Sequence, residues 1–164
     1  MARTLTSDPV VARQWRYQPR TPSRQDAYDI MIGATDAAFV VCSNRGDRDV
    51  GIVNFLGLNL ADRRVFYAVA HLPEVRNAGW PMEGTGLAIN WAFRTWPVNK
   101  VQGVVERATH AGKAARGAGR LFEVEAEVPS MVYSDGTWDD LLLVATTREH
   151  WQAWKDGVGR PGDP

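Results

Sequence analysis

Within residues 65–96 the hydrophobic period changes abruptly from that of a strand to that of a helix. Residues 65–70 are apolar and β-prone, and a proline follows soon after them. Beyond a short loop, apolar residues recur at helical spacing, with Pro81 in the first turn and Pro97 just past the end. The sequence therefore predicts a strand, a loop and a helix over 81–96.

The loop VRNAGW between this strand and helix is typical of an anion site. Backbone N–H groups at a helix start converge on one point, and the positive end of the helix dipole lies behind them. A phosphate is the expected guest. The spacing from Gly79 to Gly84 is that of a P-loop, but Thr85 and Gly86 replace the Lys and Ser/Thr, which excludes a nucleotide triphosphatase. The GxGxxG pattern of a dinucleotide fold is absent.

The length of 164 residues fits one domain, here 11–156, with flexible tails at 1–10 and 157–164. There are 19 basic and 19 acidic side chains, so the overall charge indicates neither nucleic acid nor an anionic membrane as a partner. The single cysteine, Cys42, lies in an apolar run and is expected to be a core thiol. No run is long enough to span a bilayer, and we expect a cytoplasmic protein.

The remaining pattern predicts an alternation of strands and helices. Thr21 is the expected cap of a first helix, with Tyr28, Met31 and Ile32 on its apolar face, and Thr147 begins a last helix that buries Trp151 and Trp154. The predicted strands cover 11–18, 37–43, 50–58, 65–71, 100–106, 120–133 and 138–146, and a short helix covers 107–117. We predict a single α/β (α+β) domain: a mixed, mostly antiparallel sheet with one parallel β-α-β crossover and flanking helices.

This succession over residues 11–156 resembles the GNAT acyltransferases, and more narrowly their ribosomal-protein alanine N-acetyltransferase branch. The family cradles the coenzyme A pyrophosphate with Gln/Arg-x-x-Gly-x-Gly/Ala, which stands here as Arg76-Asn77-Ala78-Gly79-Trp80-Pro81, with Pro81 in place of the last small residue. The other matching segments are Ile89 to Phe93 with Lys100-Val101, Gly119 to Glu123, Tyr133 to Asp140, and Thr146 to Trp151.

The resemblance implies transfer of an acyl group from acetyl-CoA or another acyl-CoA to an amine, without a metal. The residues that it places at the cofactor are Leu72, Arg76, Asn77, Ala78, Gly79, Trp80, Met82 and Glu83. The amine must lose a proton, the tetrahedral oxyanion must be stabilised, and the thiolate must leave. A backbone N–H near the end of strand 65–71 would serve the oxyanion.

Three residues are candidates for the general base. Alternation puts Val65, Tyr67, Val69 and His71 on one face of the strand, with His71 nearest the loop. An imidazole titrates near neutral pH, so His71 suits the role. Glu106, at the end of the next predicted strand, and His110 are the other candidates. The alternatives are a hydrogen-bonded strand-end histidine for His71 and plain surface polarity for Glu106 and His110.

The sequence departs from the family where an acid is expected. Ala108 and Ala115 stand at the positions that many GNAT enzymes give to an Asn and to the Tyr that protonates the leaving thiolate. The thiolate leaves unassisted, which its pKa of about 8.5 permits, or Tyr67 or Tyr133 substitutes, or the donor is not acetyl-CoA. Tyr67 and Tyr133 are also the candidate substrate-binding residues.

Three functions therefore stay open. The first is an acyl-CoA-dependent N-acyltransferase acting on a small-molecule or peptide amine. The second keeps the fold but takes the acyl group from an aminoacyl-tRNA or a carrier protein. Its support is the altered loop, the missing Asn and Tyr, and basic residues in two places: the N-terminal arginines, and Arg107, Lys113, Arg116 and Arg120. The third is a non-catalytic binding module. Whether the chain is a homodimer is also open.

Overall fold

The computed structural model describes residues 23–43, 48–75, 80–114, 121–134 and 136–157. The chain divides into two compact units. The first comprises residues 1–58 and 65–96, and the second comprises 59–64 and 97–164. Three predicted features lie outside the described residues: the strand 11–18, both tails apart from Gly157, and most of the turn at 44–48.

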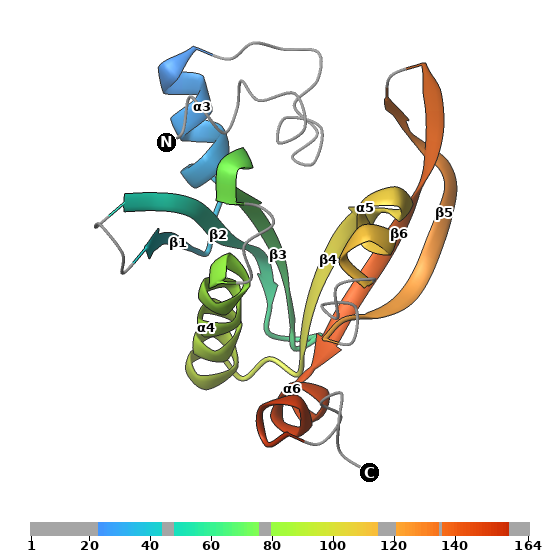
Figure 1. Cartoon of the computed structure of the whole chain (residues 1–164). Coiled ribbons are helices and arrows are strands. Elements are labelled where there is room, and N and C mark those ends of the chain that lie inside the picture. The colour runs from blue at the N-terminus through green and yellow to red at the C-terminus, as the bar shows by residue number, and fades with distance from the viewer. Residues whose placement is uncertain (1–22, 44–47, 76–79, 115–120, 135, 158–164) are drawn as a thin grey trace. The chain divides into compact units, whose positions relative to one another are not determined.

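The first unit follows the order predicted around residues 65–96. Its elements are α3 (Arg24–Ile32), β1 (Ala37–Ser43), β2 (Arg48–Asn59), β3 (Arg64–His71), the 3-10 turn η1 (Pro73–Val75) and α4 (Trp80–Thr95) (Figure 1). The strand order within the unit is β1-β2-β3, and β1 pairs antiparallel with β2. The core of this unit includes Val53, Phe55 and Val65, none of which is measurably exposed.

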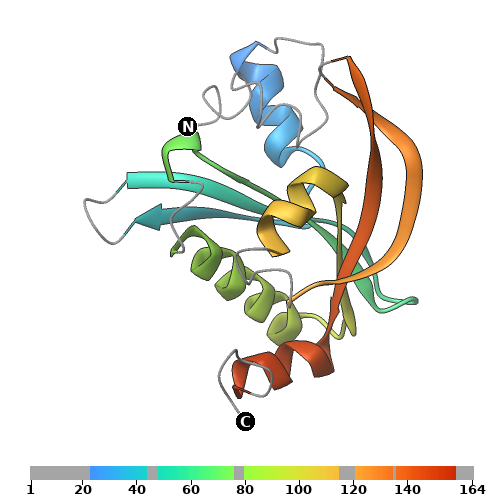
Figure 2. The same cartoon turned by 45° about the vertical axis from the view of Figure 1, so that its right-hand side comes forward.

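Helix α4 packs against β1 (Figure 2). A Cβ at Gly84 would lie 2.5 Å from Cγ1 of Val41, so only a glycine allows this approach. Further along the helix, the Trp91 ring meets Phe39 of β1 edge to face, with centroids 4.8 Å apart. Cys42, the residue after Val41 on β1, is exposed. The prediction of a core thiol was wrong, because Val41 takes the inward position and strand side chains alternate between faces.

The cap of the first helix lies two residues later than predicted, at Ser23 instead of Thr21. Ser23 is its N-cap and forms a capping box with Asp26: the Asp26 N–H donates to Ser23 Oγ at 3.1 Å, and the Ser23 N–H donates to Asp26 Oδ2 at 3.1 Å. Thr21 lies outside the described residues. On the predicted apolar face, Tyr28 is 53% exposed and Ile32 37% exposed.

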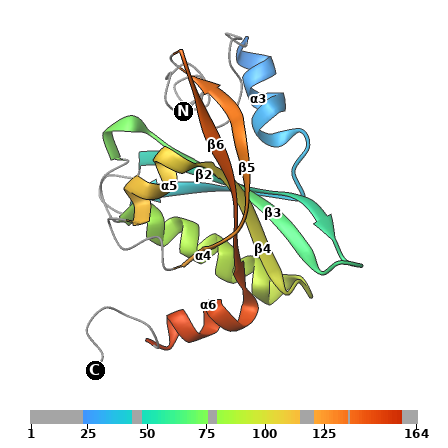
Figure 3. The same ribbon diagram turned by 90° about the vertical axis from the view of Figure 1, so that its right-hand side faces the viewer.

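Among its described residues, the second unit has three paired strands and two helices. Its elements are β4 (Lys100–Glu106), α5 (Arg107–Ala114), β5 (Glu123–Ser134), β6 (Thr137–Thr147) and α6 (Arg148–Lys155) (Figure 3). The order is β4-β6-β5, and β6 pairs antiparallel with both neighbours. Lys100 lies opposite Thr147, and Glu106 lies opposite Leu141. The register of β5 shifts twice, at 124–126 and at 128–132.

Strand β6 begins after a hairpin turn and ends at a helix cap, as the sequence predicted. Gly136 makes the hairpin turn with φ 81°, a left-handed conformation that favours glycine. At the other end, Thr147 caps α6 by accepting a hydrogen bond from the His150 N–H at 3.1 Å. Trp151 is buried, whereas Trp154 is half-buried and stacks on it with ring centroids 5.3 Å apart.

The turn at 59–64 belongs to the second unit because of its backbone contacts. Arg63, at φ 54°, accepts hydrogen bonds through its carbonyl from the N–H groups of Asn99 and Lys100 at 2.7 and 3.2 Å. Along the described residues, no helix has the length and apolar character needed to cross a membrane. The same residues contain no group of three or more His, Cys, Asp or Glu side chains arranged for a metal ion.

Candidate active site

The structure describes the residues before and after the predicted anion-binding loop, up to Val75 and from Trp80 on. Strand β3 ends at His71, η1 follows, and α4 begins at Trp80, of which only the backbone is described. The N–H of Leu72 donates to the Val50 carbonyl at 2.8 Å, and the Leu72 carbonyl accepts from the Val75 N–H at 3.1 Å. Both polar groups of Leu72 are thus engaged within the unit, and its side chain is 5% exposed. Arg76, Asn77, Ala78 and Gly79 lie outside the described residues.

His71 is half-buried at the end of β3 and lies directly over the backbone of β2. An added Cβ at Gly51 would come within 2.5 Å of His71 Cδ2 and 2.7 Å of the Ala70 carbonyl oxygen. The missing side chain at Gly51 therefore makes the space in which the imidazole packs. Sequence reasoning overlooked Gly51, although an isolated glycine inside a strand signals a close backbone approach.

An ion pair joins η1 to the start of β2. Arg48 Nη2 lies 2.5 Å from Glu74 Oε1, and both side chains are largely exposed. The pair fixes the turn that follows His71 on one side, since Glu74 lies three residues after it. It also neutralises one carboxylate beside the segment in which an anionic ligand is expected.

The first turn of α4 contains two of the predicted cofactor residues. Met82 is half-buried, and Glu83 is exposed. A carboxylate in a first turn stabilises the helix through its dipole but opposes an anion bound at the same end. Glu83 is the acidic residue of this turn. A phosphate bound at the predicted site would therefore be repelled by this carboxylate.

Tyr67 lies on β3, four residues before His71. Burial raises the pKa of its phenol above the ordinary value of 10. The hydroxyl of Tyr67 therefore stays protonated at neutral pH and is a hydrogen-bond donor rather than a base.

In the second unit, Glu106 and His110 lie together at one junction. Strand β4 ends at Glu106, and α5 begins at the next residue with no loop between them. Glu106 is 6% exposed, so the alternative of surface polarity was wrong for it. The Thr109 hydroxyl donates to Glu106 Oε2 at 3.5 Å. One residue further, the Nε2 atom of His110 is buried and makes no hydrogen bond to any described residue.

The remaining predicted site residues are distributed as follows. Tyr133 is 61% exposed on β5 and packs against Trp138, which is 64% exposed, with ring centroids 5.1 Å apart. Ala108, at the expected Asn position, is exposed in the first turn of α5. Ala115, at the expected Tyr position, lies outside the described residues.

Several solved structures that resemble this fold are N-acetyltransferases. Spermidine N-acetyltransferase from Vibrio cholerae, solved with CoA and spermine, matches with a TM-score of 0.76 at 15% identity over 92% of this chain and 89% of that one. The chain has the GNAT fold. A putative phosphinothricin N-acetyltransferase matches with a TM-score of 0.70 at 12% identity, over 88% of this chain and 89% of that one. No family model and no curated protein sequence matches the chain.

These likenesses confirm the predicted α/β class and the GNAT fold. The six described strands run in the predicted order along the chain, with α4 between β3 and β4. A GNAT-fold protein carries its chemistry in particular side chains, not in the fold as such. The assignment of His71, Glu106 and His110 thus rests on the local geometry of each unit.

Proposed function

We propose that this protein is an N-acyltransferase that moves an acyl group, in the first instance acetyl, from acyl-CoA to a primary amine. One observation carries the proposal: the fold matches that of a CoA-bound N-acetyltransferase over 92% of the chain. The predicted anion site adds to it, because α4 is 16 residues long and its N-terminus follows directly on the loop that resembles the family's pyrophosphate segment.

The reaction forms one bond and breaks one. The amine nitrogen attacks the thioester carbonyl, the tetrahedral oxyanion collapses, and the carbon–sulfur bond breaks to give an amide and the CoA thiolate. Acyl-CoA supplies the activated carbonyl. The base takes a proton from the amine, and the thiolate takes a proton from an acid or from water.

We assign the base role to His71, Glu106 or His110 and retain all three for testing. His71 carries an imidazole, the side chain most often used as a general base, and lies at the strand end nearest the predicted cofactor segment. Glu106 is a buried carboxylate directly before α5, and a carboxylate can serve as a general base. His110 brings a buried ring nitrogen to the same junction. Tyr67, kept protonated by burial, is the proposed donor to the thiolate or to the acceptor.

The proposed acceptor is a small-molecule or peptide amine. The two structural neighbours are named as acetyltransferases of spermidine and of phosphinothricin, both small-molecule amines. The sequence also resembles the ribosomal-protein alanine branch, whose acceptor is a peptide N-terminus. The exposed pair Tyr133 and Trp138 supports an acceptor with an apolar or cationic portion, because aromatic faces attract both. We place the reaction in the cytoplasm and leave the chain either monomeric or homodimeric.

A donor other than acyl-CoA, such as an aminoacyl-tRNA or a carrier protein, is the competing proposal. Of the basic residues that favoured it, Arg107 bonds to Glu127 and Asp140. The structure does not describe the other basic residues: the side chain of Lys113, and all of Arg116, Arg120 and the arginines at 3–20. Because two carboxylates already hold Arg107, this residue gives no support to a polyanionic donor such as tRNA.

Calorimetry with acetyl-CoA tests the donor. Binding at micromolar to millimolar ligand is expected, and desulfo-CoA and adenosine bisphosphate serve as controls for the phosphate tail. Absence of binding at millimolar acetyl-CoA, together with salt-sensitive retention of aminoacyl-tRNA, would instead support the competing donor.

Thiol release and mass spectrometry of the product test the reaction. The acceptor panel contains spermidine, phosphinothricin and a peptide with an N-terminal alanine. Because Cys42 is exposed and would react with thiol reagents, the assay uses Cys42→Ser as background. Among His71→Gln, Glu106→Gln and His110→Gln, the residue that is the base should lower kcat on the order of 100-fold. If all three variants keep wild-type kcat, none of them is the base.

A further inference from the structure

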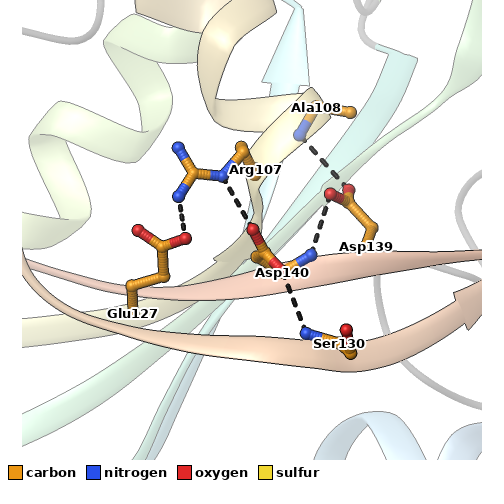
Figure 4. Close-up of polar contacts among 6 residues, drawn as sticks. All are labelled: Arg107, Ala108, Glu127, Ser130, Asp139 and Asp140. Carbon is orange, nitrogen blue, oxygen red and sulfur yellow. Dashed lines mark hydrogen bonds and ion pairs between the residues drawn. The ribbon is translucent and has the colours of Figure 1, made fainter.

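Arg107, the first residue of α5, is held by two carboxylates of the β5–β6 hairpin (Figure 4). Its Nη2 pairs with Glu127 of β5, and its Nε lies 3.1 Å from Asp140 Oδ2 of β6. The planar guanidinium presents several donors in a fixed fork, so two carboxylates fix both its position and its orientation. The start of α5 is thereby attached to both strands at once.

Asp139 caps the same helix from outside its own sequence. The Ala108 N–H is one of the donors that a helix start leaves unpaired, and the residue before α5 is Glu106 rather than a usual capping residue. Asp139 Oδ2 accepts from the Ala108 N–H at 3.3 Å, and Asp139 Oδ1 accepts from the Asp140 N–H at 2.9 Å (Figure 4). The negative charge also complements the helix dipole.

Asp140 is itself fixed by an irregularity of β5. Ser130 sits in the second register shift with φ 50°, an uncommon conformation for a residue other than glycine. Its N–H donates to Asp140 Oδ1 at 2.9 Å. That hydrogen bond, followed by the Arg107 contact, lowers the pKa of Asp140. The carboxylate is therefore charged and oriented when it meets Arg107.

These contacts have little value as stabilisers of the whole protein. The side chains of Arg107, Glu127 and Asp140 are 49%, 40% and 30% exposed, and pairs with such exposure contribute little to folding. What they do fix is a helix of 8 residues, too short to hold a set orientation alone. Glu106 precedes that helix directly, and His110 lies in it.

We propose that Arg107, Asp139 and Asp140 are positioning residues, which hold the start of α5 so that Glu106 and His110 keep their geometry during acyl transfer. The inference rests on the proposed function and deepens it. None of the three residues contacts a reacting atom in it. They act through the helix, and loss of their contacts lets the helix tilt on the end of β4.

The test compares Arg107→Gln with Lys100→Gln. Lys100 begins the same strand β4 and pairs with Glu125 of β5, with exposures of 32% and 30%. The control thus removes one cation of the same sheet at its other end. Arg107→Gln should lower kcat on the order of 10-fold or more, because small misplacements of reacting groups are costly. The KM for acyl-CoA and the melting temperature should match those of Lys100→Gln.

Three further measurements separate positioning from a merely structural role. Arg107→Lys, which keeps the charge but loses the fork, should restore part of the kcat. Asp139→Ala should reproduce the kcat loss through the lost cap, and Asp139→Asn, which keeps one of the two acceptor oxygens, should lose less. The last measurement adds Arg107→Gln to the variant that has lost activity, either Glu106→Gln or His110→Gln. The second substitution should cause no further loss of kcat, because Arg107 acts through the residue that is already replaced.

Hydrogen exchange gives a readout that does not depend on turnover. The amides of α5 should exchange faster in Arg107→Gln than in Lys100→Gln, while those of β6 stay equal. Unchanged kcat in an active Arg107→Gln protein, or equal kcat losses in Arg107→Gln and Lys100→Gln, would overturn the inference alone. A wild-type protein that neither binds acyl-CoA nor acylates any amine would overturn the proposed function, and the positioning role with it. Should Arg107→Gln fail to fold, Asp139→Ala decides by the same criteria.

Discussion

The imidazole of His71 occupies the space that a side chain at Gly51 would fill. A Cβ at position 51 would come within 2.5 Å of His71 Cδ2 and 2.7 Å of the Ala70 carbonyl oxygen. Both distances are far below ordinary van der Waals contact. The glycine in β2 and the histidine in β3 thus depend on each other, and the candidate base owes its position to a residue with no chemistry of its own.

Gly51→Ala should disturb both the stability of the first unit and the placement of His71. One of its two clashes is with backbone, so the free energy of unfolding should fall by about 1–3 kcal/mol. If His71 is the base, kcat should fall as well. Urea unfolding and steady-state kinetics measure the two effects.

The double variant Gly51→Ala/His71→Ala is the control for this change. Removing the ring relieves the clash with Cδ2 but not the clash with the carbonyl, so the two substitutions should be less destabilising together than their sum. Strict additivity would contradict the packing of the ring over Gly51.

Gly84→Ala should destabilise the protein, although alanine is the better helix former. The exchange gains about 1 kcal/mol of helix propensity. Against this, the new methyl would lie 2.5 Å from Cγ1 of Val41, a buried β-branched side chain with little freedom to move. Overpacking of this kind costs about 1–3 kcal/mol, so the loss prevails.

The sign of this effect should reverse in the background Val41→Ala. There the clashing methyl groups are gone, and Gly84→Ala should raise the free energy of unfolding by about 1 kcal/mol. Thermal or urea unfolding of the four proteins checks it. Destabilisation by Gly84→Ala of the same size in both backgrounds would contradict the close contact between α4 and β1.

Glu83→Gln should strengthen acyl-CoA binding. Its carboxylate lies in the first turn of α4, where it opposes a bound phosphate through charge repulsion. Removal should lower the Kd for acetyl-CoA by roughly 2–5-fold at low salt, consistent with the 0.3–1 kcal/mol of such interactions. The free energy of unfolding of the ligand-free protein should fall by about 0.3 kcal/mol, because the helix dipole loses a favourable charge. Glu149→Gln, in the first turn of α6, is the matched control and should leave the Kd unchanged.

The stability of the second unit should depend on pH through Asp140. The Ser130 N–H and then Arg107 lower the pKa of this carboxyl below 3.8, so the folded state holds its proton more weakly than the unfolded state. The stabilisation is complete above pH of about 4 and is lost as the pH falls through the lowered value. Asp140→Asn should flatten the slope of unfolding free energy against pH below about pH 4.

Glu125 should make a second, independent contribution in the same acidic range. The hydrogen bond from Lys100 lowers the pKa of its carboxyl below 4.5. Asp140→Asn and Glu125→Gln should each remove part of the slope, and the double variant should remove the sum, because the two residues share no partner. Urea unfolding between pH 3 and 6 gives the slopes. A wild-type slope in Asp140→Asn would show that the carboxylate is not held as described.

Hydrophobic period and turn chemistry predict most elements from the sequence alone. The strand-to-helix change at 65–96 became β3 and α4, and the Asp-Gly turn became the β5–β6 hairpin. Thr147 was predicted as the start of the last helix and is its cap. These features are encoded within a few neighbouring residues, so a local pattern is sufficient to predict them.

The sequence by itself determined the order of strands and helices, the candidate residues at their ends and the resemblance to one acyltransferase fold. Only the tertiary structure decided that Cys42 is exposed, that Glu106 is buried, that Gly51 makes room for His71 and that Asp139 caps a helix 31 positions away along the chain. Periodicity reports which face of an element is apolar. Burial, close approach and capping across strands depend on what another segment brings to that face, and no local pattern contains this information.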